Sequence, residues 1–188
     1  MKIYNEATQQ IKQCGTRRGA NMGILRVDHP DVLEFIHCKD DDNGITNFNI
    51  SVTITDKFMQ ALAKDEEYEL IAPNTQQPAG KLSARKVWNE IAQSAWKTGD
   101  PGLVFIDRIN QSSSNPIRAD GWEVESTNPC GEQPLYPFDA CNLGSIFLKY
   151  FVRDKQVDWE KLKQTVHTSV RMLDSVIEMN PFPLPQIA

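Results

Sequence analysis

The sequence predicts an α/β domain, and three observations support this class. Stretches with the patterns of strands and helices alternate through the first two thirds of the chain. The apolar run at 103–106 is continuous, as is typical of a parallel strand that is covered on both faces. The length of 188 residues, with 40% hydrophobic residues, is enough for one sizeable core.

Charge and cysteine content exclude other classes of protein. The net charge of −5 gives no case for disorder or for a nucleic-acid surface. No signal peptide opens the chain, and no apolar run is long enough to cross a bilayer. Four cysteines without tight spacing suit a reducing compartment. We therefore expect a cytoplasmic protein with neither a nucleic-acid nor a membrane partner.

The chain begins with a helix, a strand and a second helix. Residues 1–13 predict a short helix with few apolar anchors, and residues 20–27 predict a strand. His29-Pro30 begins the second helix, whose apolar stripe is Val32, Phe35 and Ile36. The acidic run at 40–44 lacks the alternating ligand spacing of a calcium loop, which favours a solvated turn.

Residues 47–54 alternate strictly between apolar and polar side chains. One face carries Phe48, Ile50, Val52 and Ile54, and the other carries Asn49, Ser51 and Thr53. The pattern alone favours an edge strand with one face in water. A parallel strand covered by helices is the alternative, and its polar face would then have to line a polar cavity.

Two further helices follow this strand. Asp56 is expected to cap the first, and Glu69-Leu70-Ile71 is a brief apolar segment before a loop at 73–80. Ser83 caps the next, which ends at the turn 99–102 and carries the stripe Val87, Trp88, Ile91 and Ala95.

The last third contains a loop, the most polar motif of the chain and a long helix. Residues 107–121 are loop-like, and 122–125 lead into the motif. Asp158 is expected to cap a helix that Asn180-Pro181-Phe182-Pro183 breaks, with the apolar positions Leu162, Val166, Val170, Leu173 and Ile177.

The motif at 126–148 carries the candidate chemistry. It places Asn128, Cys130 and Glu132 on alternate residues, which in an extended segment would project to one side. Pro129 favours an extended Asn128, and Gly131 removes the side chain that would keep a ligand from the backbone beside the thiol. Cys141 then opens an apolar stretch that predicts a strand.

Alternatives for the thiols remain open. Free cysteine is often a small buried hydrophobe, although the polar neighbours of Cys130 argue against this for that residue. Without a Cys-x-x-Cys, and with the histidines distant in sequence, we predict no metal site. Nucleophilic catalysis would need His29, His37 or His167 to come close in the fold.

Two stretches carry a resemblance to a known family. Asn-Pro-Cys-Gly-Glu-Gln-Pro-Leu at 128–135, followed by Cys-Asn-Leu-Gly-Ser-Ile at 141–146, resembles the active-site segment of the adenosylcobalamin-dependent (class II) ribonucleotide reductases. Residues 11–25 resemble the specificity loop of that family and the strand after it. The resemblance implies that residues 1–188 are a central fragment of a ten-stranded α/β barrel. The specificity loop would lie at about 11–20 and a central finger loop at about 126–138.

The resemblance also implies residue roles. Adenosylcobalamin would generate a thiyl radical on Cys130, which removes the C3′ hydrogen of a ribonucleotide. Glu132 would take the proton of the 3′-hydroxyl, and Asn128 would hydrogen-bond the sugar. Cys141 would supply half of a redox-active disulfide, whose partner we expect upstream of residue 1, because neither Cys14 nor Cys38 matches that position.

The basic turn at 14–19 has two interpretations. It is either a solvated surface turn or, with its planar guanidinium donors, a site that contacts a base or a phosphate. The resemblance favours the second interpretation and assigns substrate contact and effector response to Lys12, Gln13, Arg17 and Arg18.

The resemblance implies a ribonucleoside-diphosphate reductase that makes deoxyribonucleotides for DNA synthesis. Its other partners would be an effector nucleotide, complementary reductase segments and a thioredoxin-type reductant, and we expect this chain alone to be inactive. The alternative is a small nucleotide-binding or thiol-redox module that uses Arg17, Arg18 and the thiols without radical chemistry.

Overall fold

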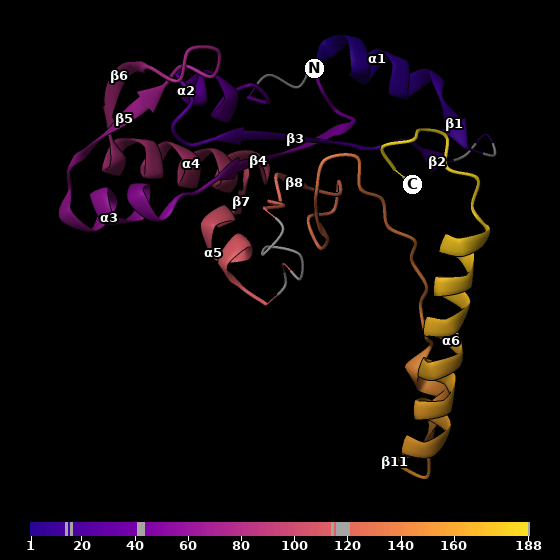
Figure 1. Ribbon diagram of the computed structural model, residues 1–188. Helices are drawn as coiled ribbons and strands as arrows, with labels where there is room; N and C mark the ends of the chain where they lie inside the picture. The colour runs from indigo at the N-terminus through magenta and orange to yellow at the C-terminus, as the bar shows by residue number, and fades with distance from the viewer. Residues whose placement is uncertain (14, 16, 41–43, 114, 116–120, 188) are drawn as a thin grey trace. The chain divides into compact units, whose positions relative to one another are not determined.

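The computed structural model divides the chain into two compact units, Met1–Pro137 and Phe138–Ala188 (Figure 1). It describes residues 1–13, 15, 17–40, 44–113, 115 and 121–187. Cys14, most of the acidic turn at 40–44 and residues 116–120 of the predicted loop therefore lie outside the described residues.

The first unit is organised on a three-stranded parallel sheet in the order β3-β4-β7. The strands are β3 (Asn21–Arg26), β4 (Phe48–Thr53) and β7 (Gly102–Val104). The register pairs Met22 with Asn49 and Ser51 with Gly102. Because β4 pairs on both sides, the prediction of an edge strand from its pattern alone is wrong, and the parallel alternative holds.

Three helices bury the apolar face of this sheet. They are α2 (Val32–Ile36), α3 (Asp56–Lys64) and α4 (Ala84–Thr98) (Figure 1). The side chains between the sheet and the helices form the main hydrophobic core of the unit. Burial of each large aliphatic or aromatic side chain in it contributes about 1.5–3 kcal/mol to stability. Its buried members are Val27, Val32, Ile36, Val52, Ile54, Phe58, Ala61, Leu62, Tyr68, Leu70, Ala84, Val87 and Ile91.

Caps define the helix ends. Ser83 Oγ accepts from Lys86 N, and Gly99 ends α4 with a φ of 85°, so both predicted boundaries are confirmed. The cap of α3 is Thr55, whose hydroxyl accepts from Phe58 N. The predicted cap at Asp56 is therefore wrong by one residue, and Asp56 lies instead in the first turn, where a carboxylate interacts favourably with the helix dipole.

Two short segments differ from the sequence expectation. The loop predicted at 73–80 is shorter, because β5 (Glu67–Ile71) pairs in antiparallel fashion with β6 (Pro78–Ser83). The loop predicted from residue 107 contains a helix, α5 (Ile106–Gln111). Ile106 packs with Val104 and Val124 in a separate cluster, and this apolar contact holds the helix.

Before the sheet, α1 (Lys2–Gln10) leads to the hairpin of β1 (Lys12–Gln13) and β2 (Arg17–Arg18). The helix has one buried residue, Asn5, whose Oδ1 accepts from Asn47 N at 3.0 Å. The amide of Asn47 in turn donates to Asn5 O at 3.2 Å. Polar contacts rather than an apolar stripe therefore join α1 to the residue before β4.

The second unit consists mainly of the helix α6 (Trp159–Met179). Asp158 Oδ1 accepts from Lys161 N, which confirms the predicted cap. Of the predicted stripe, Leu162 and Leu173 are half-buried, whereas Val166, Val170 and Ile177 are exposed. The remaining elements are the 3-10 helix η2 (Leu148–Phe151) and the hairpin of β10 (Val152–Arg153) and β11 (Gln156–Val157).

The predicted strand at Cys141 is absent, because residues 141–147 have no regular secondary structure. Among the described residues no sheet closes on itself, so the structure supports the α/β class but does not confirm a ten-stranded barrel. In the same part of the chain, no helix is both long and apolar enough to cross a membrane.

Candidate active site

The site forms on the face of the sheet that points away from the three helices. Phe48, Ile50 and Val52 are buried in the apolar clusters on the helical side. Side chains alternate along a strand, so Asn49 and Ser51 belong to the opposite face. Paired residues of neighbouring strands share a face, which adds Met22 of β3 and Gly102 of β7.

The thiol-bearing segment is a tight hairpin loop. β8 (Ser126–Thr127) pairs with β9 (Pro134–Leu135), and residues 128–133 connect them. Gly131 N donates to Asn128 O at 3.0 Å, which closes a turn around Pro129 and Cys130. The expected extended segment with its alternating side chains is therefore wrong.

Asn128 holds this loop together. Its backbone N donates to Gln133 O at 3.1 Å, and its side-chain Oδ1 accepts from Gln133 N at 3.1 Å. An asparagine side chain that bonds a backbone group in this way stabilises a turn locally. Its Nδ2 makes no hydrogen bond within the described part of the chain.

Gly131 is required for its backbone conformation. Its φ is +84°, a value that other L-residues rarely adopt. A Cβ at this position would meet no protein atom within 4 Å, so there is room for a side chain and only the backbone conformation disfavours one. This constraint on φ adds to the expectation that glycine lets a ligand approach the backbone, which stays a prediction.

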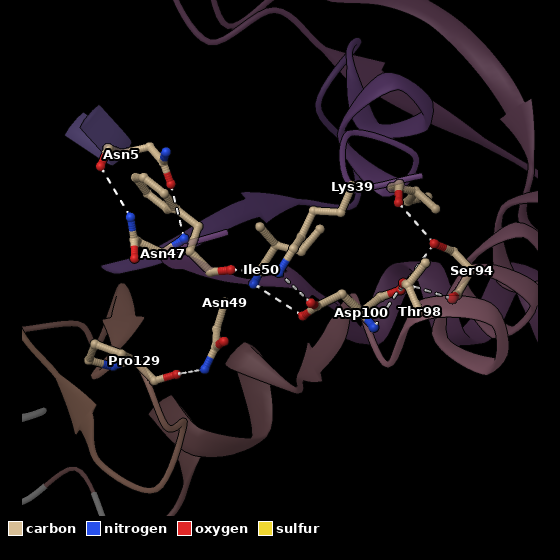
Figure 2. Close-up of polar contacts among 11 residues, drawn as sticks. Asn5, Lys39, Asn47, Asn49, Ile50, Ser94, Thr98, Asp100 and Pro129 are labelled. Carbon is tan, nitrogen blue, oxygen red and sulfur yellow. Dashed lines mark hydrogen bonds and ion pairs between the residues drawn. The ribbon is translucent and has the colours of Figure 1, made fainter. Parts of the chain in front are cut away.

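Among the described residues, one side chain joins the loop to the polar face of the sheet by a hydrogen bond. Asn49 Nδ2 donates to the carbonyl oxygen of Pro129, the residue before Cys130 (Figure 2). Beside this contact lies a cleft of about 450 Å³. Its lining comes from β3, β4, the end of α4, β7 and the loop: Met22, Asn49, Ile50, Ser51, Thr98, Gly99, Asp100, Gly102, Leu103, Val104, Pro129, Cys130 and Gly131.

Gly102 lines this cleft at a point where a side chain would crowd Ser51. It pairs with Ser51, and a Cβ at position 102 would lie 2.8 Å from Ser51 Oγ. Such a contact would push the hydroxyl aside. The sequence alone indicates Gly102 only as part of the turn that ends a helix, because its contact with Ser51 depends on the neighbouring strand.

Charged and polar groups around Asp100 fix the start of β4. Lys39 Nζ lies 2.7 Å from Asp100 Oδ2 and donates to Phe48 O at 2.7 Å (Figure 2). Asp100 O accepts from the hydroxyls of Ser94 at 3.0 Å and Thr98 at 3.1 Å. Sequence reasoning missed this network, because its members are up to 61 residues apart.

The predicted catalytic residues have different surroundings. Cys130 is an exposed, free thiol that lines the cleft. Glu132 is also exposed and lies on the same loop, but it does not line the cleft. Asn128 is half-buried. The residues described here therefore present the thiol to a cleft but do not exclude water from it.

Two other thiols, Cys38 and Cys141, belong to the described residues. Cys141 is free and exposed in the second unit. Cys38 is free and half-buried beside Phe48 and Ile50, and burial raises the pKa of its thiol. For Cys38, burial outweighs the neighbouring Lys39, whose positive charge by itself would lower that pKa.

The histidines of the first unit are occupied elsewhere. His37 lies 3.0 Å from Asp40 Oδ2 and 3.2 Å from Glu90 Oε2, and His29 Nδ1 accepts from Asp31 N. Neither lines the cleft of Cys130, which removes these two candidates for a thiol–imidazole pair. Within the ranges that the structure describes, no group of three His, Cys, Asp or Glu side chains could hold a metal ion.

The residues on either side of the predicted basic turn form a hairpin, so the helix expected over 1–13 ends earlier, at Gln10. Lys12 pairs with Arg18, and Gln13 pairs with Arg17. The Arg18 side chain is exposed. This pairing brings the four predicted substrate and specificity residues into one two-stranded element.

A larger cavity of about 660 Å³ lies where β3 and β4 end. Arg26, Thr53, Asp107 and Trp122 are in its lining, and Cys130 is not. Thr53 Oγ1 is buried without a hydrogen-bond partner in the described part of the chain. The thiol therefore belongs to the smaller of these two hollows, and sequence reasoning gave no sign of the other.

The chain is similar to known proteins over its whole length. All of 1–188 match the family model described as ribonucleotide reductase, barrel domain. The whole chain aligns with 24% of the length of a vitamin B12-dependent ribonucleoside-diphosphate reductase from Thermoplasma acidophilum, and the aligned residues are 51% identical. The whole chain also aligns with 27% of the length of a vitamin B12-dependent ribonucleoside-diphosphate reductase from Mycobacterium tuberculosis, at 38% identity. It aligns with 20% of the length of a vitamin B12-dependent ribonucleotide reductase from Rhodopirellula baltica, at 31% identity. The chain thus spans about a quarter of the length of these relatives.

Proposed function

The chain belongs to the ribonucleotide reductase barrel-domain family, and from this premise we propose that it forms the thiyl-bearing part of an adenosylcobalamin-dependent ribonucleoside-diphosphate reductase. The observation that carries the proposal is the position of Cys130. Its thiol lies on a turn fixed to the polar face of a parallel sheet, beside a cleft of about 450 Å³. A hollow of that volume suits a nucleoside-sized group.

The cleft fits the nucleoside part of the cofactor as well as a nucleotide substrate. Its lining offers the hydroxyls of Ser51 and Thr98, which suit sugar and base groups. We propose that these residues contact the adenosyl group of adenosylcobalamin or the substrate ribose, with the corrin ring held by other surfaces. When bound, the cofactor supplies the radical chemistry that the protein cannot supply.

We propose a separate role in the reaction of the ribose for each of Cys130, Asn128 and Glu132. The Cys130 sulfur, once it has lost its hydrogen atom, removes the hydrogen at C3′ and returns it at the end of the reaction. The Asn128 amide donates to a sugar oxygen, and the Glu132 carboxylate takes the 3′-hydroxyl proton. The C2′ hydroxyl takes a proton from the reducing thiol pair and leaves as water.

The two electrons for this reduction come from a pair of thiols. Cys141 is one member, and its sulfur forms a disulfide with a partner thiol as the ribose is reduced. A thioredoxin-type reductant restores the pair. The free state of Cys141 is consistent with this role and with a reducing cytoplasm.

Substrate and effector recognition is proposed for the hairpin at residues 12–18. The backbone pairs Lys12 with Arg18 and Gln13 with Arg17, and these residue types suit contact with a base or a phosphate. Effector binding would then change the base that this hairpin accepts.

The experiment combines this chain with the complementary segments of a longer reductase. We expect ribonucleoside diphosphate to be converted to deoxyribonucleotide only when the segments, adenosylcobalamin and a dithiol are all present. Cys130→Ser should abolish this conversion while substrate binding remains. Reduction of substrate by the Cys130→Ser protein would overturn the assignment, and nucleotide binding without reduction by the wild-type assembly would favour a binding module instead.

A further inference from the structure

We propose that Asn49 is a positioning residue, which holds the turn of Cys130 in one place over the cleft. The proposal rests on the proposed function, because it concerns the sulfur that carries the radical. Asn49 Nδ2 donates to the carbonyl of Pro129, which is bonded directly to the nitrogen of Cys130 (Figure 2). The contact joins residues 80 positions apart in the sequence.

The strand beneath Asn49 is rigid on both sides. β3 pairs with all six residues of β4, and β7 pairs with its last three. Ahead of the pairing with β7, Lys39 donates to Phe48 O, and Asp100 Oδ1 accepts from Ile50 N at 3.4 Å. The backbone on either side of Asn49 is therefore fixed, and its side chain is a short, stiff connection to the loop.

The loop, by contrast, has few other attachments at its tip. Its internal bonds all involve Asn128, Gly131 and Gln133, so they fix the shape of the turn and not its position on the sheet. Cys130 and Gly131 are exposed. A turn of fixed shape that rests on one amide can swing as a unit when that amide is removed.

Radical chemistry gives this contact its importance. A hydrogen atom passes only between groups in contact, and misplacement of a reacting group by about 1 Å can cost about 100-fold in rate. Asn49 is exposed, although it lies in the central strand of the sheet. Its side chain adds little to the hydrophobic core, and among the residues described its amide makes no other hydrogen bond that would compete with the one to Pro129 O.

The test uses the 188-residue chain and the variant Asn49→Asp, which keeps the shape but replaces the donor with an acceptor that repels the carbonyl of Pro129. Asn74→Asp is the matched control, because it makes the same change at an exposed turn. Amide hydrogen exchange at residues 130–133 should accelerate by about threefold to tenfold in Asn49→Asp. Exchange in β3 and β4, and exchange throughout Asn74→Asp, should stay at the wild-type rate.

A spin label on Cys130, with the other cysteines changed to serine, reports the same motion. We expect a narrower, more mobile spectrum in Asn49→Asp and no change in Asn74→Asp. Equal loop exchange and equal label mobility in the two variants would overturn the proposal. So would a uniform acceleration across the sheet, which would mark Asn49 as a purely structural residue.

The wild-type protein provides a measurement that does not depend on a variant. The side-chain amide protons of Asn49 should exchange more slowly than those of Asn74, and equal rates would contradict the contact. In the assembled reductase, Asn49→Asp should lower kcat more than it changes KM. Full activity of the Asn49→Asp assembly would refute the positioning role but not the proposed function. An inactive wild-type assembly would refute the proposed function, and the exchange and spin-label measurements would still test the contact between Asn49 and Pro129.

Discussion

Replacement of Asp100 by asparagine tests how firmly β4 is fixed beneath the site. Asp100 Oδ2 lies 2.7 Å from Lys39 Nζ, and the two side chains are only 19% and 21% exposed. Asparagine keeps the shape of the side chain and removes its charge. Lys39 would then retain Phe48 O but lose its only carboxylate among the described residues.

The magnitude follows from the burial of the pair. At an effective dielectric constant of 20, two charges 2.7 Å apart attract by about 6 kcal/mol before any desolvation cost. Breaking a fully buried pair costs about 3–5 kcal/mol, and breaking an exposed pair costs about 0–1 kcal/mol. For a pair that is about one-fifth exposed, we expect Asp100→Asn to lower the free energy of unfolding by about 2 kcal/mol.

Urea unfolding measures this change, with hydrogen exchange of β4 amides to locate it. Asp65→Asn is the matched control, because the Asp65–Arg85 pair is 71% and 50% exposed at 3.3 Å. This control should change stability by less than about 0.5 kcal/mol. Equal effects of the two substitutions would refute the argument that burial makes the Lys39–Asp100 pair strong.

Three further predictions concern the core and the loop. Phe58→Ala should cost about 3–5 kcal/mol in urea unfolding, because Phe58 is 1% exposed and its ring lies edge-on to Tyr68 at 5.0 Å; a loss below about 1 kcal/mol would contradict the packing. Burial raises the pKa of Tyr68, with a smaller contribution from Asp28, so its stabilising effect is complete below the unfolded pKa of about 10 and is lost as pH rises through the folded value. Stability should therefore fall above about pH 10 in the wild type and fall less in Tyr68→Phe, and identical pH profiles would exclude the ionisation of Tyr68 as the cause. Gly131→Ala should cost about 1–2 kcal/mol of local loop stability, seen as faster exchange at residues 128–133, because alanine is strained at a φ of +84°; unchanged exchange would show that the loop adopts another conformation.

Local signals predicted the helix ends well. Ser83 and Asp158 cap their helices as expected, and Gly99 ends α4, because each depends on bonds within a few residues. Thr55 and Asp56 are both good caps, and the sequence alone does not rank such neighbours. α5 was missed because its N-cap, Phe105, provides no side-chain signal and continues an apolar run typical of a strand.

The sequence predicted which face of β4 is polar, but it did not predict the shape of the loop that carries Cys130. The alternation of residues 47–54 correctly separated the apolar face from Asn49, Ser51 and Thr53. The same period of two was wrong at residues 128–132, where Pro129 and Gly131 are the turn signals that should have prevailed. The strand expected at Cys141 did not form, since a strand needs a hydrogen-bonding neighbour and residues 141–147 pair with none among the described residues.

The contacts on which the site depends were beyond sequence reasoning. Asn49 with Pro129, and Lys39 with Asp100, join residues that only the fold brings together. The catalytic roles of Cys130, Glu132 and Cys141 come from family resemblance and remain predictions.

The strict alternation of β4 has a consequence for changes in chain length. Insertion of one residue within 48–53 would turn the amide of Asn49 toward the helices or carry an aliphatic side chain into the cleft, because a shift of one position exchanges the two faces. The same insertion at residues 73–77, between β5 and β6, would only lengthen a turn. Engineered tags and natural length variation should therefore be tolerated at 73–77 and rejected within β4.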